Sequence, residues 1–410
     1  MQNVSQAWEQ TNRDNFTRPA GMILSFTFAD DTTATVSDSR IITFNYSKSG
    51  DILSGVLTQD TIKFEFDNFD GQFTYNPEND KYTGATVAVT CTFTAADYES
   101  SDPISGGLYY ITDVNSENKK TTFTAKSILA FMKSTVDDIS GTCRQVVQSI
   151  ITDANNDPAV PADSITYSLD SSLNSVTVSV YKTDNLSQAE VLQLIANACG
   201  CILYSDRTGR IHIEKLGTIA ETYVLSGKIS YEFPKAKVLE KVGRVMISYD
   251  HGAGSGGTSG GGQQIGATQT MTNPIINDDF DAQAAMRNAY DIQQVARRRI
   301  SGNFRADPRL DLFDIVSVPY QDMLSVCTLT KLNLTFNGGW RGTYEAIEIS
   351  GSDVDTRICD IEMITAGQFE SLRIEQLHPN TISDSDGNYM AASGGRLAFW
   401  KEDDEDNGEL

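Results

Sequence analysis

The chain has 410 residues, enough for two to four domains of about 150 residues each. Apolar residues make up 40% of it and 31 glycines add to them, so a sizeable core is expected. The 32 basic and 55 acidic side chains give a formal net charge of −23, which disfavours duplex DNA and anionic lipid surfaces as binding partners.

Residues 21–137 show the period-of-two alternation that is typical of strands. Apolar side chains alternate with polar ones over 24–28, 62–66 and 87–93. Between two of these segments, the string Asn68–Gly71 has the composition of a turn. We therefore expect a multi-stranded antiparallel block here.

Residues 138–219 contain the clearest helical patterns. One apolar helical face covers 141–155, and Ser187 with Glu190 forms a capping box that begins a second helix. A hairpin with its turn at 206–209 follows the second helix. These features predict a small α+β unit.

Residues 220–365 return to strand patterns, with two exceptions. The glycine-rich tract 252–262 has almost no side chains to pack and is expected to be a flexible loop. An amphipathic helix is expected over 282–300, where three arginines near its end suit the helix dipole. In a later strand, a phase slip between Leu329 and Leu332 predicts a β-bulge.

Neither end of the chain carries a core pattern. Residues 1–20 lack the apolar segment of a secretion signal, and no apolar run is long enough to span a bilayer. Residues 366–410 are polar and finish in an acidic run, which predicts a solvated tail or one ordered by a partner. The six scattered cysteines are typical of thiols in a reducing cytoplasm, and they do not suggest a disulfide framework.

Candidate catalytic and metal-binding residues are few. His212, His251 and His378 have no cysteine or carboxylate at zinc-site spacing, and we interpret His212 as structural. Cys199 and Cys201 flank the expected end of a helix, and we interpret them as core thiols rather than as a redox pair.

Motif-like strings also fail their physical tests. The G-x-S-x-G string at 257–261 lies in a glycine run, without the strand-to-helix turn that exposes a nucleophile. The turns at Gly71 and Gly387 lack the glutamate that closes an EF-hand loop, although the acidic turn 67–70 could hold an adventitious cation. The sequence therefore predicts no catalytic residue, no cofactor site and no built metal site.

Several strings nevertheless occur in a recognisable order along the chain. They are Ile52–Thr58 with Ile62–Asn68, Gly106–Asp113 with Thr121–Leu129, Ala189–Gly200 with the hairpin turn after it, and Ala306–Val318 with Asn337–Gly339. Together they resemble the tail-hub proteins of tailed bacteriophages, which include baseplate hubs and the non-enzymatic N-terminal part of tail-tip proteins. The similarity covers about residues 20–365. The family commonly has a glycine before Asp314, where this chain has Phe313.

The resemblance implies a mainly β fold with an α+β insertion, in which two β-barrel-like hub domains flank a small α+β unit. The implied division is an N-terminal arm (1–20), a first hub domain (21–137), an insertion (138–219), a second hub domain (220–365) and an acidic tail (366–410). It also implies a trimer whose six barrel-like domains present a pseudo-sixfold face. Such a ring would join a hexameric tail tube to the tip, spike or fibre and let DNA pass.

The implied role is structural, non-enzymatic and located in the virion tail, after synthesis in the host cytoplasm. Expected partners are two further copies of the chain, the tail tube or distal tail protein, the end of the tape-measure protein, and a spike or fibre protein. No cofactor, no specific nucleic-acid binding and no stable membrane binding are expected. The acidic charge would keep the phosphates of passing DNA from adhering.

Two other functions remain open. A receptor- or carbohydrate-binding module of a phage tail or bacterial surface would present a cluster of exposed aromatic side chains, whereas Trp8, Trp340 and Trp400 lie far apart in the sequence. A peptidoglycan hydrolase would need an acid–base pair, and the 55 carboxylates single out no such pair.

Overall fold

The computed structural model describes residues 20–349 with short gaps, together with three strands between 381 and 400. The gaps are 53–56, 77–79, 83, 94–102, 118, 162–164, 181–185, 217–222, 226–228, 241, 251–255, 262–266, 277–281, 290–297 and 321–322. The predicted arm up to residue 19, His251, His378 and most of the acidic tail lie outside the described residues.

Thirteen strands form the largest sheet. They are β1 Ala20–Thr27, β2 Thr33–Ser37, β3 Ile41–Ser49, β4 Gln59–Asp67, β5 Thr86–Phe93, β6 Ile104–Glu117, β7 Lys120–Lys126, β13 Tyr223–Val224, β14 Lys235–Val238, β18 Arg298–Phe304, β19 Ile315–Tyr320, β20 Met323–Phe336 and β21 Trp340–Glu348.

Smaller sheets and the helices make up the rest. The strands are β8 Ile139–Thr142 with β10 Thr177–Val180; β9 Tyr167–Leu169, β11 Cys201–Ser205 and β12 Ile211–Lys215; β15 Val242–Asp250, β16 Gly256–Gly261 and β17 Ala267–Thr272; and β22 Thr381–Ser383, β23 Tyr389–Ser393 and β24 Arg396–Trp400. The helices are α2 Cys143–Asn155, α3 Gln188–Ala198, a helical segment at 282–289, and short 3-10 helices at Asp38–Arg40, Ile128–Ala130 and Ser171–Leu173.

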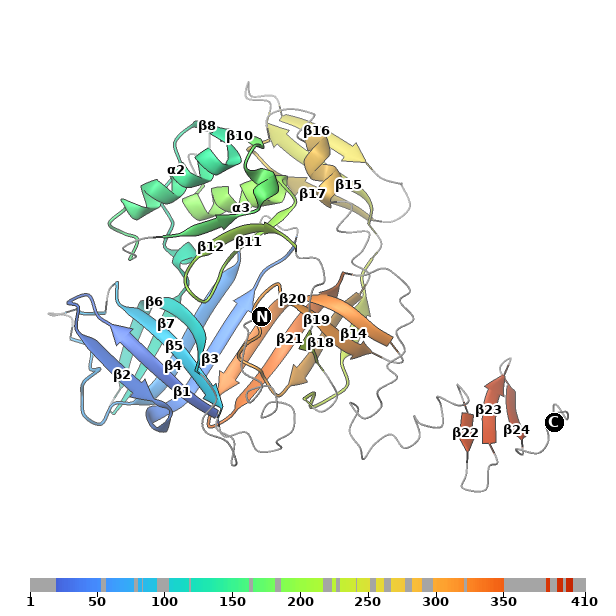
Figure 1. The fold of residues 1–410 in the computed structure, drawn as a ribbon, viewed down its shortest axis with the longest axis horizontal. Coiled ribbons are helices and arrows are strands. Elements are labelled where there is room, and N and C mark those ends of the chain that lie inside the picture. Colours follow the sequence, from blue (N-terminus) through green and yellow to red (C-terminus); the bar gives the residue numbers. More distant parts are fainter. Residues whose placement is uncertain are drawn as a thin grey trace.

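The large sheet runs without a break through both expected hub domains (Figure 1). Its order is β2-β1-β5-β6-β7-β4-β3-β20-β21-β18-β14, and β19 with β13 branches from β20. The two halves join where β3 pairs antiparallel with β20, with Ser49 opposite Lys331 and Phe44 opposite Phe336. The mainly β fold is thus confirmed. The described strands form no closed barrel, because β3 uses β20 of the other half to cover its edge.

Five strands of the first half recur in the second half with the same neighbours. The first repeat is β5-β6-β7-β4-β3, and the second repeat is β19-β20-β21-β18-β14. All pairs within both repeats are antiparallel. The two halves are therefore related in topology, although each carries additional strands of its own.

Both repeats have a β-bulge at the same place in their longest strand. Thr112 is the extra residue of β6, and Thr330 is the extra residue of β20, at the predicted phase slip. The Thr112 hydroxyl donates to the Thr124 carbonyl at 3.1 Å, and the Thr330 hydroxyl donates to the Glu345 carbonyl at 3.3 Å. The match fixes the alignment of the two repeats residue by residue.

With the bulges aligned, the next strands also stay in register. Ile62 of β4 corresponds to Ile300 of β18. Each lies opposite an alanine of its neighbour in the sheet, which is β7 for Ile62 and β21 for Ile300. One strand further, Tyr46 of β3 lies opposite Ile62, and Ala236 of β14 lies opposite Ile300. Strand β14 is therefore the counterpart of β3.

The turns that enter the two repeats match as well. In Tyr82–Ala85 the amide of Ala85 donates to the Tyr82 carbonyl at 2.9 Å, and in Asp311–Asp314 the corresponding distance is 3.2 Å. The third residue has a positive φ in both turns, +80° at Gly84 and +65° at Phe313. Phe313 therefore keeps the left-handed backbone conformation that Gly84 adopts in the first repeat, at the cost of a left-handed non-glycine residue.

The largest hydrophobic core covers one face of the sheet in both halves. In the first half it is built from phenylalanines: the rings of Phe64, Phe66 and Phe123 stack with centroids 5.4 to 6.2 Å apart, and Phe26 and Phe73 pack against them. Full burial of each such ring contributes about 1.5–3 kcal/mol, so this cluster is a main source of stability.

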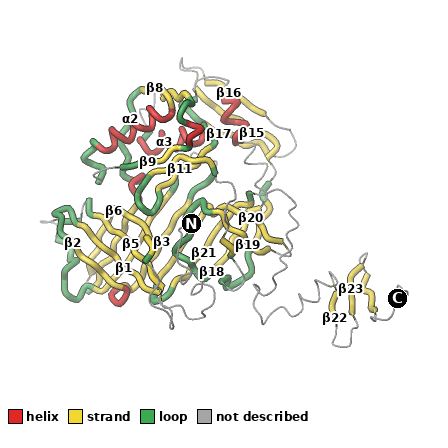
Figure 2. Tube along the Cα trace, in the orientation of Figure 1, coloured by secondary structure: helices red, strands yellow, loops and turns green. Residues whose placement is uncertain are grey.

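The α+β unit follows the sequence closely. Both helices begin with complete capping boxes, Thr142 with Gln145 on α2 and the predicted Ser187 with Glu190 on α3. Gly200, with a φ of +66°, follows the end of α3. Figures 1 and 2 place the hairpin β11–β12 between these helices and the large sheet.

One predicted element is wrong, and a second is right only in its first part. Part of the glycine-rich tract is strand β16, which pairs with β15 from Val245 to Asp250; backbone hydrogen bonds suffice for this pairing. The helix expected over 282–300 is helical at 282–289, and the chain is strand from Arg298 onward. Pairing of β18 with β21 there outweighs the helical periodicity.

Candidate functional site

The large sheet has an apolar face and a polar face, because side chains alternate along each strand. On β4, Ile62, Phe64 and Phe66 are buried in the core, whereas Lys63 and Glu65 point to the other side. The same alternation holds on β3, β7, β20 and β21. A continuous polar face therefore extends across the joint between the two halves.

This polar face is not acidic, although the whole chain carries a formal charge of −23. Its basic members on the described strands are Lys63, Lys120, Lys126, Lys235, Lys237, Arg299, Lys331 and Arg341. Its acidic members are Glu65, Asp67, Asp113, Glu117 and Glu345. The expectation that acidity would keep phosphates away is thus not met on this face.

Several charges of the polar face are paired across neighbouring strands. Lys120 Nζ lies 2.9 Å from Glu65 Oε1, and Lys331 Nζ lies 3.5 Å from Glu345 Oε1. Each exposed pair contributes only about 0–1 kcal/mol to folding. Their main effect is to neutralise Lys120 and Lys331 locally, while the basic side chains of this face still outnumber its acidic ones.

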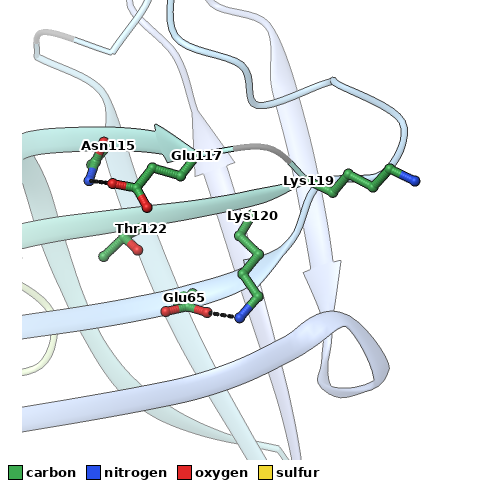
Figure 3. A pocket seen from close by; sticks show the side chains of 6 residues that line it. All are labelled: Glu65, Asn115, Glu117, Lys119, Lys120 and Thr122. Atoms are coloured by element: carbon green, nitrogen blue, oxygen red, sulfur yellow. Dashed lines mark hydrogen bonds and ion pairs between the residues drawn. The ribbon is translucent and has the colours of Figure 1, made fainter.

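A hollow of about 750 Å³ opens on the polar face at the end of the β6–β7 hairpin. It is lined by Glu65, Asn115, Glu117, Lys119, Lys120 and Thr122. In Figure 3, Asn115 donates a hydrogen bond to Glu117 on the same strand, and Lys120 reaches Glu65 on the neighbouring strand β4. Its open, charged lining suits contact with another polar surface better than enclosure of a small apolar ligand.

A buried ionic junction connects the two halves of the sheet with the α+β unit. Lys48 of β3, only 1% exposed, donates to the Ser205 carbonyl at 2.8 Å. Its ammonium also lies 3.0 Å from Asp311 Oδ1 and 3.3 Å from Asp60 Oδ2. One cation thus holds residues from three parts of the chain.

Arg207, at the tip of the β11–β12 hairpin, supplies the second cation of the junction. Its guanidinium donates to the carbonyl of Ser105 at 2.8 Å and to the carbonyl of Leu310. Its Nε lies 3.5 Å from Asp311 Oδ2. The hairpin tip is therefore fixed to both halves of the sheet at once.

Asp311 is the anion on which the junction is centred. It accepts a hydrogen bond from the Tyr46 hydroxyl at 3.0 Å besides its contacts with the two cations. Burial raises the pKa of the carboxyl, but Lys48 and Arg207 outweigh burial and lower it to about 2. Asp311 therefore stays ionised throughout the ordinary pH range.

The pKa of Asp60 shifts in the opposite direction. Burial raises its pKa above the usual value, and Lys48 offsets this only in part. One of its oxygens, Oδ1, has no hydrogen-bond partner among the described residues. Asp60 is the weakly satisfied member of the junction.

Sequence reasoning missed this junction, although one signal was present. Phe44, Tyr46 and Lys48 alternate on β3, so Lys48 occupies a position that faces the core. A cation at a core position requires a buried anion as its partner. The sequence does not identify Asp311 as that anion, because it lies far along the chain.

His212 lies in strand β12 and braces the hairpin that carries Arg207. Its Nδ1 is 2.8 Å from Glu214 Oε1 and its Nε2 is 3.0 Å from Asp206 Oδ2. The imidazole stacks on Tyr204 with centroids 4.9 Å apart. This arrangement shapes the hairpin and its turn, which fits the structural interpretation of the histidine.

The other candidate residues have local structural contacts. Cys201 is buried, and its thiol lies 3.7 Å from the Cys199 carbonyl. In the acidic turn, Asp70 binds Arg40 at 3.0 Å and Asn68 donates to Thr121 at 3.0 Å. Within the described residues, no group of three or more His, Cys, Asp or Glu side chains could hold a metal ion.

The described part of the chain also lacks a helix that is both long enough and apolar enough to cross a membrane. Trp340 is buried against Phe44 and Phe336 and presents no exposed aromatic platform. Trp8 lies outside the described residues, as does the side chain of Trp400.

Comparison with known proteins identifies the fold. No protein-family model and no curated protein matches the chain. The 43 kDa tail protein of prophage MuSo2 from Shewanella oneidensis matches with a TM-score of 0.51 and 10% identity, over 80% of this chain and 98% of that chain. The tail protein from Neisseria meningitidis MC58 matches with a TM-score of 0.51 and 11% identity, over 80% and 97%. The prophage tail protein gp18 from Listeria monocytogenes EGD-e has a TM-score of 0.49 and 10% identity, over 79% and 94%.

The first two matches span nearly the full length of the proteins matched and 80% of this chain. This agrees with the resemblance noted in the sequence. The chain therefore shares the fold of phage tail proteins.

Proposed function

We propose that the chain is a structural hub subunit of a phage tail, and that three copies form a ring. In this proposal the ring joins a hexameric tail tube to the tip, spike or fibre, and DNA passes through its centre. The hub domains at 21–137 and 220–365 carry the two repeats, and the unit at 138–219 lies between them in the chain. The proposed role is to assemble the tail and to let DNA pass, without catalysis.

The internal repeat is the observation that carries this proposal. Three chains with two related five-strand units each supply six units, which is the number needed to match a sixfold tube. The matched bulges at Thr112 and Thr330 support near-equivalent geometry of these units. The fold of the prophage tail proteins adds independent support.

In the same proposal the polar face lines the opening of the ring. The opposite face is buried in the core and cannot face water. Short side chains such as Ser47, Thr122 and Thr343 lie between its charged pairs. Because nearby carboxylates balance only part of its basic side chains, this wall would attract DNA phosphates modestly and in a salt-dependent way.

Absolute mass in solution, combined with negative-stain imaging of the full chain, tests the ring. The expected result is a particle of three times 44.9 kDa with a central opening. Purified tail-tube protein should bind one flat side of this ring. A compact monomer, both alone and with the tube protein, would overturn the proposal.

A further inference from the structure

The large sheet has several strand edges without a neighbour among the described residues, β2 among them, and two of these edges lie on strands β14 and β6 of the repeats. Strand β14 ends the sheet on one side. Strand β6 pairs with β5 only as far as Tyr110, so its segment 111–117 has no strand on the side opposite β7. Open edges of this kind are templates for pairing with another chain.

The repeat assigns a partner to each open edge. Strand β14 is the counterpart of β3, and β6 is the counterpart of β20. Within the chain, β3 pairs with β20, beyond the bulge of β20. The equivalent of that joint would pair β14 with the part of β6 beyond its own bulge, and no described strand of the same chain occupies either segment.

Transferring the β3–β20 register to these strands brings opposite charges together. Asn45 lies opposite Thr335 in the joint within the chain. Their counterparts are Lys235 and Glu117, both exposed and both on the polar face. Lys235 is at present 3.5 Å from the exposed Glu232, which is a weak contact.

The same register covers exposed apolar surface. Lys48 lies opposite Leu332 in the joint within the chain, and their counterparts are Val238 and Val114. Val238 is 75% exposed, although it occupies a position that faces the core in the first repeat. Val114 is partly buried at the margin of the main core. Pairing would place the two valines side by side.

We propose that β14 of one copy pairs antiparallel with residues 113–117 of β6 in the next copy, in the register used by β3 and β20. This inference rests on the proposed ring and names its joint. Each chain carries one edge of each kind, so the contact is head-to-tail and closes when the rotation per copy is one third of a turn. The polar face would then continue from chain to chain.

Disulfide trapping tests the register directly. Directly opposite residues of antiparallel strands have Cα atoms about 4.5–5.5 Å apart, which is within disulfide range. The full-length double variant Val238→Cys with Val114→Cys should give covalent trimers under oxidation, reversed by reductant. The matched control is Val238→Cys with Asn115→Cys, shifted by one residue, which should give at least about tenfold less trimer because its side chains point to opposite faces.

The possible outcomes distinguish failure of the strand pairing from failure of the proposed ring. Trimers by solution mass with no cross-link in the first variant would overturn the strand pairing and leave the proposed ring standing. Monomers by mass together with no cross-link would overturn both. Equal cross-linking in the shifted control would contradict the register.

Charge exchange gives a second, independent measurement. Lys235→Glu or Glu117→Lys alone should raise the concentration needed for trimers about fivefold per joint, because like charges then lie opposite one another. The variant that carries both changes should recover wild-type association. All three should unfold at the wild-type temperature, since both side chains are exposed. Failure of the double variant to recover would contradict the pairing of these two residues.

Discussion

The two repeats share one strand order but differ sharply at their last strand. On β3, Tyr46 and Lys48 are buried. Their counterparts on β14 are Ala236 and Val238, and Val238 is exposed. The difference follows from coverage: β3 lies against β20 and the β11–β12 hairpin, whereas β14 ends the sheet. The kind of side chain at a given position therefore depends more on the elements packed against the strand than on the position of the strand in the repeat.

The entering turns differ in a related way. Tyr82 belongs to the aromatic core of the first half, and its counterpart Asp311 is the anion of the buried junction. The same backbone turn thus serves hydrophobic packing in one repeat and ionic attachment of the α+β unit in the other. Four predictions test how much each repeat depends on these differences.

The largest expected effect comes from Asp311→Asn. Lys48 and Arg207 would keep their charges in a buried site without their anion, so the free energy of unfolding should fall by about 3–5 kcal/mol. Equilibrium denaturation in urea measures this loss. The exposed Asp137→Asn is the matched control and should change stability by less than about 0.5 kcal/mol. A loss below about 1 kcal/mol for Asp311→Asn would show that the junction does not anchor the second repeat.

The pH dependence of stability should reveal the same carboxylate. Its folded pKa of about 2 lies below the usual 3.8, so its contribution is present above pH 4 and is lost as the pH falls toward 2. The difference in stability between wild type and Asp311→Asn should shrink by about 2 kcal/mol over this range. Asp60 has a raised pKa and contributes with the opposite sign. A difference that stays constant with pH would contradict the ionic role of Asp311.

Gly302→Ala should destabilise the second repeat by about 1–3 kcal/mol. Gly302 corresponds to Phe64 of the first repeat, and the Tyr344 ring fills the space beside it. An added Cβ would lie 2.9 Å from the Tyr344 hydroxyl and 3.0 Å from its ring. Thermal unfolding should show the loss, and adding Tyr344→Phe should recover part of it. Gly339→Ala, where a Cβ meets nothing within 4 Å, serves as the control.

The smallest effect concerns the left-handed residue of each turn. Gly84→Ala should cost about 1 kcal/mol, because φ is +80° there and the nearest atom to a new Cβ is 3.8 Å away. In the second repeat, Phe313→Gly and Phe313→Ala lose the same ring, which packs on Tyr204. The glycine variant should be the more stable of the two by about 1 kcal/mol in denaturant unfolding. Equal stabilities would mean that the turn relaxes.

Local chemistry explains which parts of the fold could be predicted. The capping box at Ser187 and the bulge after Leu329 depend on neighbouring residues and are confirmed. The helix predicted through residue 300 ended early, because pairing of β18 with a distant strand overrides its periodicity. Strand β16 formed in a glycine tract for the same reason, with β15 as its template.

The candidate site was less predictable, because it depends on contacts between distant segments. Thr112 and Thr330 occupy equivalent bulges, yet nothing in the sequences around them shows that they correspond. The Lys48–Asp311 contact joins residues on opposite sides of the α+β unit in the chain. Order along the sequence indicated two strand-rich halves, and only the pairing of β3 with β20 showed how they meet.

The β3–β20 joint has a consequence for assembly kinetics. In a ring of the proposed kind, half of the six contacts between units form as each polypeptide folds, at a rate that does not depend on concentration. Only three contacts between molecules remain, of which two form by collision and the third by closure of the ring, so assembly would proceed at dilutions where six separate units would stay apart. In such a ring, tethering would also fix the alternation of unlike units around the opening.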